Sequence, residues 1–143
     1  MTVIAWDGHT LAADKRMTCA GRATTTRKLY GVNGKIVAFS GDADGGMELL
    51  AWFSNGADPE KFPARGRHEK DWTLLVVVDK DGLVFYERTP YPIRCEDPFW
   101  ACGSGRDYAL AAMYLGKSAR EAVDVACHFD TGCGNGIDEM RVL

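Results

Sequence analysis

Short apolar runs bounded by turn residues make up most of this sequence, and this pattern predicts β-strands. Near the start, residues 3–6 and 11–14 flank an Asp-Gly pair, which predicts a hairpin whose first strand lies unusually close to the first residue of the chain. A second hairpin is expected around the Lys-Asp-Gly turn at 80–82. The expected strands are residues 3–6, 11–14, 22–30, 35–40, 72–79, 83–88, 99–102 and 137–143.

Three segments have apolar residues at helical spacing. The first helix is expected after Gly41-Asp42, with Met47, Leu49, Leu50, Trp52 and Phe53 on its apolar face. The second follows Gly103-Ser104-Gly105 and is expected to turn Tyr108, Leu110, Ala111, Ala112, Tyr114 and Leu115 inward. The third is capped by Ser118 with Glu121 in a capping box, and its inward residues are Ala119, Ala122, Val123, Val125 and Ala126.

The order of these elements indicates the fold class. Four strands precede the first helix, two or three strands follow it, and two helices and a last strand complete the chain. Residues 57–71, which are rich in Pro, Gly and charge, are expected to form a surface loop. Because strands and helices are grouped rather than alternating, we predict an α+β fold in which helices cover two antiparallel sheets.

Composition narrows the range of functions. With 143 residues, 46% of them hydrophobic, the chain is long enough for one domain, residues 1–143, with a core of its own. The net charge of −3 and the lack of a basic stripe argue against nucleic acid as a partner. The sequence shows neither a bilayer-spanning apolar run nor the features of a signal peptide, so a cytoplasmic protein with no membrane partner is expected.

The five cysteines do not predict a metal site. Cys127, His128 and Cys133 lie close together, but their spacing matches no familiar zinc pattern and no fourth ligand is evident. Buried or free thiols are therefore the preferred interpretation, and no metal or cofactor is expected.

Five separated motifs carry a resemblance to a known family. They are Thr2 directly after the initiator Met, the strand LAADKR at 11–16, KLY at 28–30 with IVAFSGDA at 36–43, GSG at 103–105, and DTGCG at 130–134 with Ile137-Asp138. In their order and spacing, the sequence resembles the proteasome β-subunit family, which includes the bacterial heat-shock-locus peptidase. These proteins are N-terminal-nucleophile hydrolases with a four-layer α/β/β/α sandwich.

The resemblance implies a threonine peptidase whose nucleophile is Thr2 once Met1 has been removed. The α-amino group of Thr2 would then serve as the base, because such a group titrates near neutrality. Lys28 maps to the family lysine beside the threonine, where a cation favours a developing anion, and Asp14 would hold that lysine. Lys15 and Lys35 are weaker candidates, because Lys15 should point to the face opposite Asp14 and Lys35 lies at a turn.

Further residues are assigned by the same resemblance. Ser104, Asp130 and Cys133 map to the groups around the amine of the threonine, with a thiol in Cys133 where the family has a hydroxyl. Ala38 stands where the family has a glycine whose backbone N–H contributes to the oxyanion hole. Ser40 is expected near the pocket that receives the substrate side chain.

The resemblance also implies partners: a peptide or unfolded protein as substrate, a homo-oligomeric ring, and an ATPase unfoldase that no residue of the sequence identifies. One outer helix of the family is predicted to be missing or reduced, because residues 57–71 are too short and too rich in Pro and Gly for it. The sequence leaves three alternatives open. They are a small-amide hydrolase of the same fold, an inactive ring or scaffold subunit, and an unrelated α+β binding module.

Overall fold

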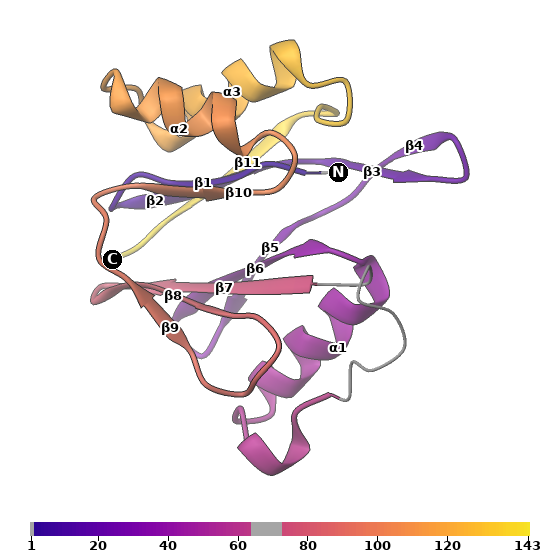
Figure 1. Cartoon of the computed structure of the whole chain (residues 1–143), viewed down its shortest axis with the longest axis vertical. Coiled ribbons are helices and arrows are strands. Elements are labelled where there is room, and N and C mark those ends of the chain that lie inside the picture. Colours follow the sequence, from indigo (N-terminus) through magenta and orange to yellow (C-terminus); the bar gives the residue numbers. More distant parts are fainter. Residues whose placement is uncertain (1, 64–72) are drawn as a thin grey trace.

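A computed structural model describes residues 2–63 and 73–143 of the chain, which fold around two antiparallel sheets (Figure 1). The strands before the first helix are β1 (Ile4–Trp6), β2 (Thr10–Asp14), β3 (Arg16–Cys19), β4 (Arg22–Thr25), β5 (Leu29–Val32) and β6 (Lys35–Gly41). Helix α1 (Ala43–Ser54) and the 3-10 turn η1 (Pro59–Lys61) follow, and then β7 (Thr73–Asp79), β8 (Gly82–Tyr86), β9 (Ile93–Cys95) and β10 (Trp100–Cys102). Helices α2 (Arg106–Tyr114) and α3 (Ala119–Phe129) precede the last strand, β11 (Ile137–Arg141).

The first sheet has the strand order β10-β1-β2-β11 and carries the start of the chain in its centre. Helices α2 and α3 lie side by side on one face of this sheet (Figure 1). Small residues line that contact, among them Ala12, Ala109 and Ala122, and all three are fully buried. Small side chains let the two helices approach the strands closely, so the N-terminal strand is enclosed on both sides.

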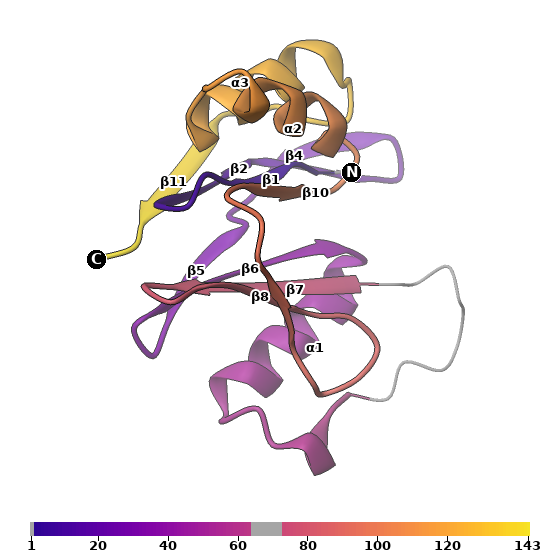
Figure 2. The ribbon, with the colours of Figure 1, turned by 60° about the vertical axis from the view of Figure 1, so that its left-hand side comes forward.

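The second sheet has the order β5-β6-β7-β8-β9. Its central strand β7 is buried at every position except its last, as expected for the continuous apolar run of its sequence. One face of this sheet packs against the first sheet through residues such as Ile36, Val76 and Val78. The other face is covered by α1, whose Leu49 and Trp52 are buried there (Figure 2).

A separate two-stranded hairpin, β3–β4, extends from the body of the molecule at the end where the described chain begins (Figure 1). Most of its residues are exposed. Two strands alone are marginally stable in water, so contacts at the base of this hairpin are needed to hold it in place.

The structure confirms the α+β class, both predicted hairpins and the capping box of α3, in which Ser118 and Glu121 bond each other's backbone N–H. The predicted number of strands was wrong, because six rather than four precede α1. The segment expected as a single strand at 22–30 forms two strands, β4 and β5. The turn between β5 and β6 is Asn33-Gly34, so Gly31 lies inside β5. Strand β9 was also missed, since its residues follow two prolines and have no alternating pattern.

The orientation of α2 differs from the prediction. Tyr114 and Leu115 are 79% and 77% exposed, and Tyr108 is 43% exposed, whereas Ala109, Ala112 and Met113 form the buried face. Small residues face α3 and the sheet because the helices approach closely, so the large side chains point outward. Of the expected loop at 57–71, residues 64–71 lie outside the described part of the chain, as does Trp72. None of the described helices is long and apolar enough to cross a membrane.

Candidate active site

Thr2, Asp14 and Lys28 meet at the end of the first sheet, and all three are buried. The Thr2 hydroxyl donates to Asp14 Oδ1 at 3.0 Å, and Lys28 Nζ donates to Thr2 Oγ1 at 2.5 Å. Lys28 Nζ also contacts Asp14 Oδ1 at 2.6 Å. The hydroxyl oxygen, the ammonium and the carboxylate oxygen therefore form a closed triangle of mutual contacts.

The strand ladder determines where Asp14 lies. Ile4 is paired with Ala13, so Asp14 at the end of β2 comes opposite Val3, whose carbonyl accepts the Asp14 N–H at 3.2 Å. Val3 N–H donates in return to Asp14 Oδ1 at 3.1 Å. A carboxylate with no exposed surface needs such partners, because an unpaired buried charge is costly.

The start of strand β3 and one loop complete the surroundings of Asp14. The backbone N–H groups of Arg16 and Gly134 donate to Asp14 Oδ2 at 3.2 and 3.0 Å. Gly134 belongs to the loop between α3 and β11, 120 residues further along the chain. This contact could not be predicted from the sequence, because no sequence pattern marks a single backbone N–H of a loop.

Ser104, Asp130 and Cys133 form a second polar group beside the first. The Cys133 thiol donates to Asp130 Oδ2 at 3.5 Å and lies 3.8 Å from Ser104 Oγ. Ser104 Oγ donates to the Thr2 carbonyl oxygen at 3.3 Å, which connects this group to Thr2. The structure thus brings together six residues predicted from the sequence: Thr2, Asp14, Lys28, Ser104, Asp130 and Cys133.

The ionisation of this second group is set by hydrogen bonds and burial. The nearby Ser104 hydroxyl, together with the Gly132 N–H that donates to Asp130 Oδ1 at 2.8 Å, lowers the pKa of Asp130. Burial, together with the nearby carboxylate of Asp14, raises the pKa of the Cys133 thiol to about 12. Asp130 is therefore an anion at neutral pH and Cys133 a neutral donor.

Gly103 has no room for a side chain. A Cβ at Gly103 would lie 2.2 Å from the Thr2 carbonyl oxygen, and the residue has a φ of +93°, which favours glycine. The neighbouring Gly105 N–H donates to the same carbonyl at 3.1 Å. The GSG turn therefore holds the backbone of Thr2 in place. A Cβ at Gly105 would lie 2.9 Å from Val3 Cβ, so glycine is needed on both sides of Ser104.

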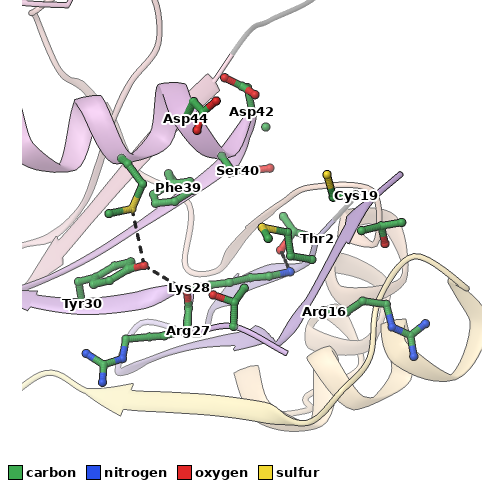
Figure 3. A pocket seen from close by; sticks show the side chains of 16 residues that line it. Thr2, Arg16, Cys19, Arg27, Lys28, Tyr30, Phe39, Ser40, Asp42 and Asp44 are labelled. Carbon is green, nitrogen blue, oxygen red and sulfur yellow. Dashed lines mark hydrogen bonds between the residues drawn. The ribbon is translucent and has the colours of Figure 1, made fainter. Parts of the chain in front are cut away.

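A cleft of about 500 Å³ opens beside Thr2 and Lys28 (Figure 3). One wall is strand β3 of the hairpin, and the other is the end of β6 with the start of α1, where Asp42 and Asp44 lie. Ser40, predicted to contact substrate, is part of the lining. Aromatic and thioether side chains supply much of the rest, namely Met17, Tyr30, Phe39 and Met47.

Ala38 does not line this cleft. Its side chain is fully buried between the sheets, and the residue pairs with Leu29 on one side and Val76 on the other. The two-residue turn Asn33-Gly34 makes Lys35 a hydrogen-bonded partner of Val32 in β5. Because backbone N–H groups alternate in direction along a strand, the odd-numbered residues of β6 direct theirs toward β5. Ala38 directs its N–H toward β7 instead, away from the β5 side on which Lys28 lies.

The two rival lysines lie elsewhere. Lys15 pairs with Asp138 at 3.6 Å near the surface, and Lys35 forms an ion pair with Asp79. Within the described residues, no three His, Cys, Asp or Glu side chains are grouped as a metal site would need.

Solved structures of other proteins resemble this chain over nearly its whole length. BPH of Thiobacillus denitrificans in complex with epoxomicin superposes with a TM-score of 0.75 at 19% identity, covering 99% of this chain and 98% of that chain. Eukaryotic HslV from Trypanosoma brucei gives a TM-score of 0.72 at 18% identity, covering 99% and 98%. The chain has the fold of the proteasome- and HslV-type subunits. No known family description matches the sequence itself.

A further structure of BPH from Thiobacillus denitrificans shares this proteasome-type fold, with a TM-score of 0.69 at 19% identity, covering 99% of this chain and 96% of that chain. Identities this low establish the fold alone. The chemistry has to be argued from the contacts of Thr2, Asp14 and Lys28.

Proposed function

We propose that this protein is a threonine peptidase of the proteasome β-subunit kind, with Thr2 as the nucleophile after removal of Met1. The observation that carries the proposal is the buried contact of Thr2 Oγ1 with Lys28 Nζ at 2.5 Å, with Asp14 Oδ1 bonded to both. A structural threonine does not need a buried ammonium beside its hydroxyl. An attacking hydroxyl does, because the cation stabilises the alkoxide as the proton leaves.

The proposed reaction has two stages. The free α-amino group of Thr2 takes the hydroxyl proton, Oγ1 attacks the peptide carbonyl carbon, and the C–N bond breaks as the amine leaves with that proton. Water, activated by the same amine, then hydrolyses the ester on Oγ1 and restores the hydroxyl. In this proposal Lys28 and Asp14 take no part in the proton transfer, so the pair supplies a fixed electrostatic field.

For the oxyanion, Gly41 fits the geometry better than Ala38. Gly41 lines the cleft and ends β6, six residues after Lys35, so its N–H is directed to the side of β5. The last residue pair between β5 and β6 is Leu29 with Ala38, so β5 provides no partner opposite Gly41. We therefore assign the backbone donor to Gly41 and regard Ala38 as a core residue.

The supporting group of Ser104, Asp130 and Cys133 is proposed to hold the amine of Thr2, and Ser40 to contact the substrate side chain. The fold that carries them is inferred to be the four-layer sandwich of the N-terminal-nucleophile hydrolases. In the described residues its α1 side has one α-helix and the η1 turn, consistent with a reduced outer helix.

The wider biology is proposed on the same basis. A peptide or unfolded protein is the substrate, and a homo-oligomeric ring in the cytoplasm encloses the site. An ATPase unfoldase would feed such a ring.

The test is the intact mass of the purified protein before and after treatment with epoxomicin, which is bound in the similar BPH structure. The expected result is loss of Met1 and one adduct per chain, both measured beside a Thr2→Ala control that forms no adduct. Retained Met1, or a processed Thr2 that does not react, would overturn the proposal in favour of an inactive scaffold subunit.

A further inference from the structure

One side chain, Asn135, joins the hairpin β3–β4 to the loop that follows α3. Its Oδ1 accepts from Arg16 Nε at 2.9 Å, and its Nδ2 donates to Thr25 Oγ1 at 2.9 Å. Arg16 and Thr25 are directly opposite each other in the ladder of the hairpin, at its base. The amide of Asn135 therefore bonds both strands of the hairpin at the point where the hairpin leaves the body of the protein.

Arg16 extends the contact to the rest of this loop. Its Nη1 donates to the Thr131 carbonyl at 2.7 Å, four residues before Asn135. Its guanidinium also lies against Gly134, since a Cβ there would be 2.6 Å from Nη2. The beginning and the end of the loop are thus tied to the same strand of the hairpin.

The two parts that are joined belong to the same cleft. The hairpin supplies the wall formed by Met17, Thr18 and Cys19, next to Thr2. The loop supplies the Gly134 N–H that donates to Asp14 at 3.0 Å. A shift of the hairpin relative to the loop would therefore alter both the cleft wall and a hydrogen bond to Asp14.

We propose that Asn135 is a positioning residue that fixes the cleft wall to the loop of the catalytic group. The inference rests on the proposed peptidase function, because it assigns Asn135 to the rate of that reaction. Loss of the amide is expected to reduce the rate of attack by Thr2, while the overall fold stays intact.

The chain offers a closely matched control. Asn135 and Asn33 both precede a glycine and both have a positive φ, of 63° and 51°. Asn33 lies in the turn between β5 and β6, and it is not a lining residue of the Thr2 cleft. Replacement by glycine suits the backbone at both positions, so N135G and N33G differ mainly in the contacts of the lost amide.

The experiment compares N135G, N33G and N135D by two measurements on the full chain. Amide hydrogen exchange of Gly134 reports on the loop, and the rate of epoxomicin labelling at saturation reports on attack by Thr2. For N135G we expect exchange to rise and labelling to slow, each roughly three- to tenfold, as for a few lost hydrogen bonds. N135D should restore both values, because its carboxylate can accept from Arg16 and from the Thr25 hydroxyl.

Each outcome has a defined meaning. If N135G matches N33G in both exchange and labelling, the inference is overturned. If exchange rises in N135G while labelling keeps its wild-type rate, Asn135 holds the loop without positioning the reaction, which also overturns it. If the wild-type protein takes no epoxomicin at all, the proposed function has failed, and exchange alone shows whether the amide holds the loop.

Discussion

The carboxylate of Asp14 is the most heavily bonded side chain in the site. Three of its five hydrogen bonds come from backbone N–H groups, of Val3, Arg16 and Gly134. Lys28, in contrast, has only Thr2 and Asp14 as hydrogen-bond acceptors in the described structure. Asp14 therefore keeps most of its hydrogen bonds if Lys28 is removed, whereas Lys28 keeps only Thr2 within the described structure if Asp14 is removed.

This asymmetry predicts unequal costs for removing either partner. Asp14→Ala leaves the buried ammonium of Lys28 without its counterion and three backbone donors without an acceptor, so we expect a loss of about 3–5 kcal/mol in the free energy of unfolding. Lys28→Met leaves a carboxylate that keeps its backbone donors, and a loss of about 1–3 kcal/mol is expected. Urea denaturation of wild type and both variants measures these differences in the free energy of unfolding. Equal costs, or a larger cost for Lys28→Met, would contradict the argument.

The cysteines should differ in reactivity. Burial raises the pKa of Cys102 and Cys133 to about 12 and that of Cys127 to about 11, while Cys19 is exposed at the rim of the cleft. Because the thiolate is the reactive form, iodoacetamide at pH 8 should modify Cys19 first and leave Cys102 and Cys133 largely intact. Peptide mass mapping over time measures the order, with the urea-unfolded chain as the control. Early modification of Cys133 would contradict the geometry of its site.

At the scale of whole elements, Asp7 connects the first hairpin to the outer helix layer. Its Oδ1 accepts from the His9 and Thr10 N–H groups in the turn, and its Oδ2 accepts from Ala119 N–H at the start of α3. Burial alone would raise the pKa of Asp7, but these three donors outweigh burial and lower it below the usual value. One turn carboxylate thus fixes the position of α3 over the sheet.

Asp7→Ala is expected to reduce the free energy of unfolding by about 1–2 kcal/mol at pH 7, the range for a lost helix cap. A carboxyl whose pKa is lowered in the folded state stabilises the protein above its unfolded pKa of 3.8, and this stabilisation is lost as the pH falls through the folded pKa. The difference from wild type should therefore shrink below pH 4 in urea titrations. Asp124→Ala, at an exposed position on the same helix, is the control and should cost clearly less at pH 7.

Gly46 shows how closely α1 packs on β6. A Cβ at this helix position would lie 2.0 Å from the Phe39 ring. Gly46→Ala should therefore destabilise the protein by about 1–3 kcal/mol, although alanine is the better helix former. In a Phe39→Ala background the same substitution should stabilise it, which denaturation of the four proteins measures. An equal effect in both backgrounds would show that the ring is not the obstacle.

The sequence predicted elements whose signals are local and missed those that depend on distant partners. The turn pairs and the capping box at Ser118 identified the hairpins and α3 directly. The outward direction of Tyr114 could not be predicted, because it follows from the close approach of α2 and α3 through small residues. The side chains around Thr2 were predicted through motifs, whereas Gly134 N–H and the amide of Asn135 act through contacts more than 100 residues apart in sequence.

At the scale of the whole molecule, the outer surface of α2 and α3 stands out. Tyr108 stacks on Phe129 with ring centroids 5.6 Å apart, and both remain exposed, as do Tyr114 and Leu115. Exposed apolar side chains on a helix pair are typical of a contact surface. The proposed homo-oligomer supplies a covering for this surface, with α2 and α3 of one copy facing another copy.

We therefore predict that the wild-type protein has a molar mass that is a multiple of the single-chain mass, as measured by size-exclusion chromatography with light scattering. The double variant Tyr114→Glu, Leu115→Glu should lower this mass toward that of one chain. Two charges at a buried apolar contact would lack partners, which costs several kcal/mol per interface. Ile93→Glu, an equally apolar but distant exposed position on β9, is the control and should keep the wild-type mass. If wild type is a single chain, enclosure in a ring is wrong, and an open site suited to small amides becomes the better interpretation. If only Ile93→Glu dissociates the assembly, the copies meet through the edge of the second sheet and not through the helices.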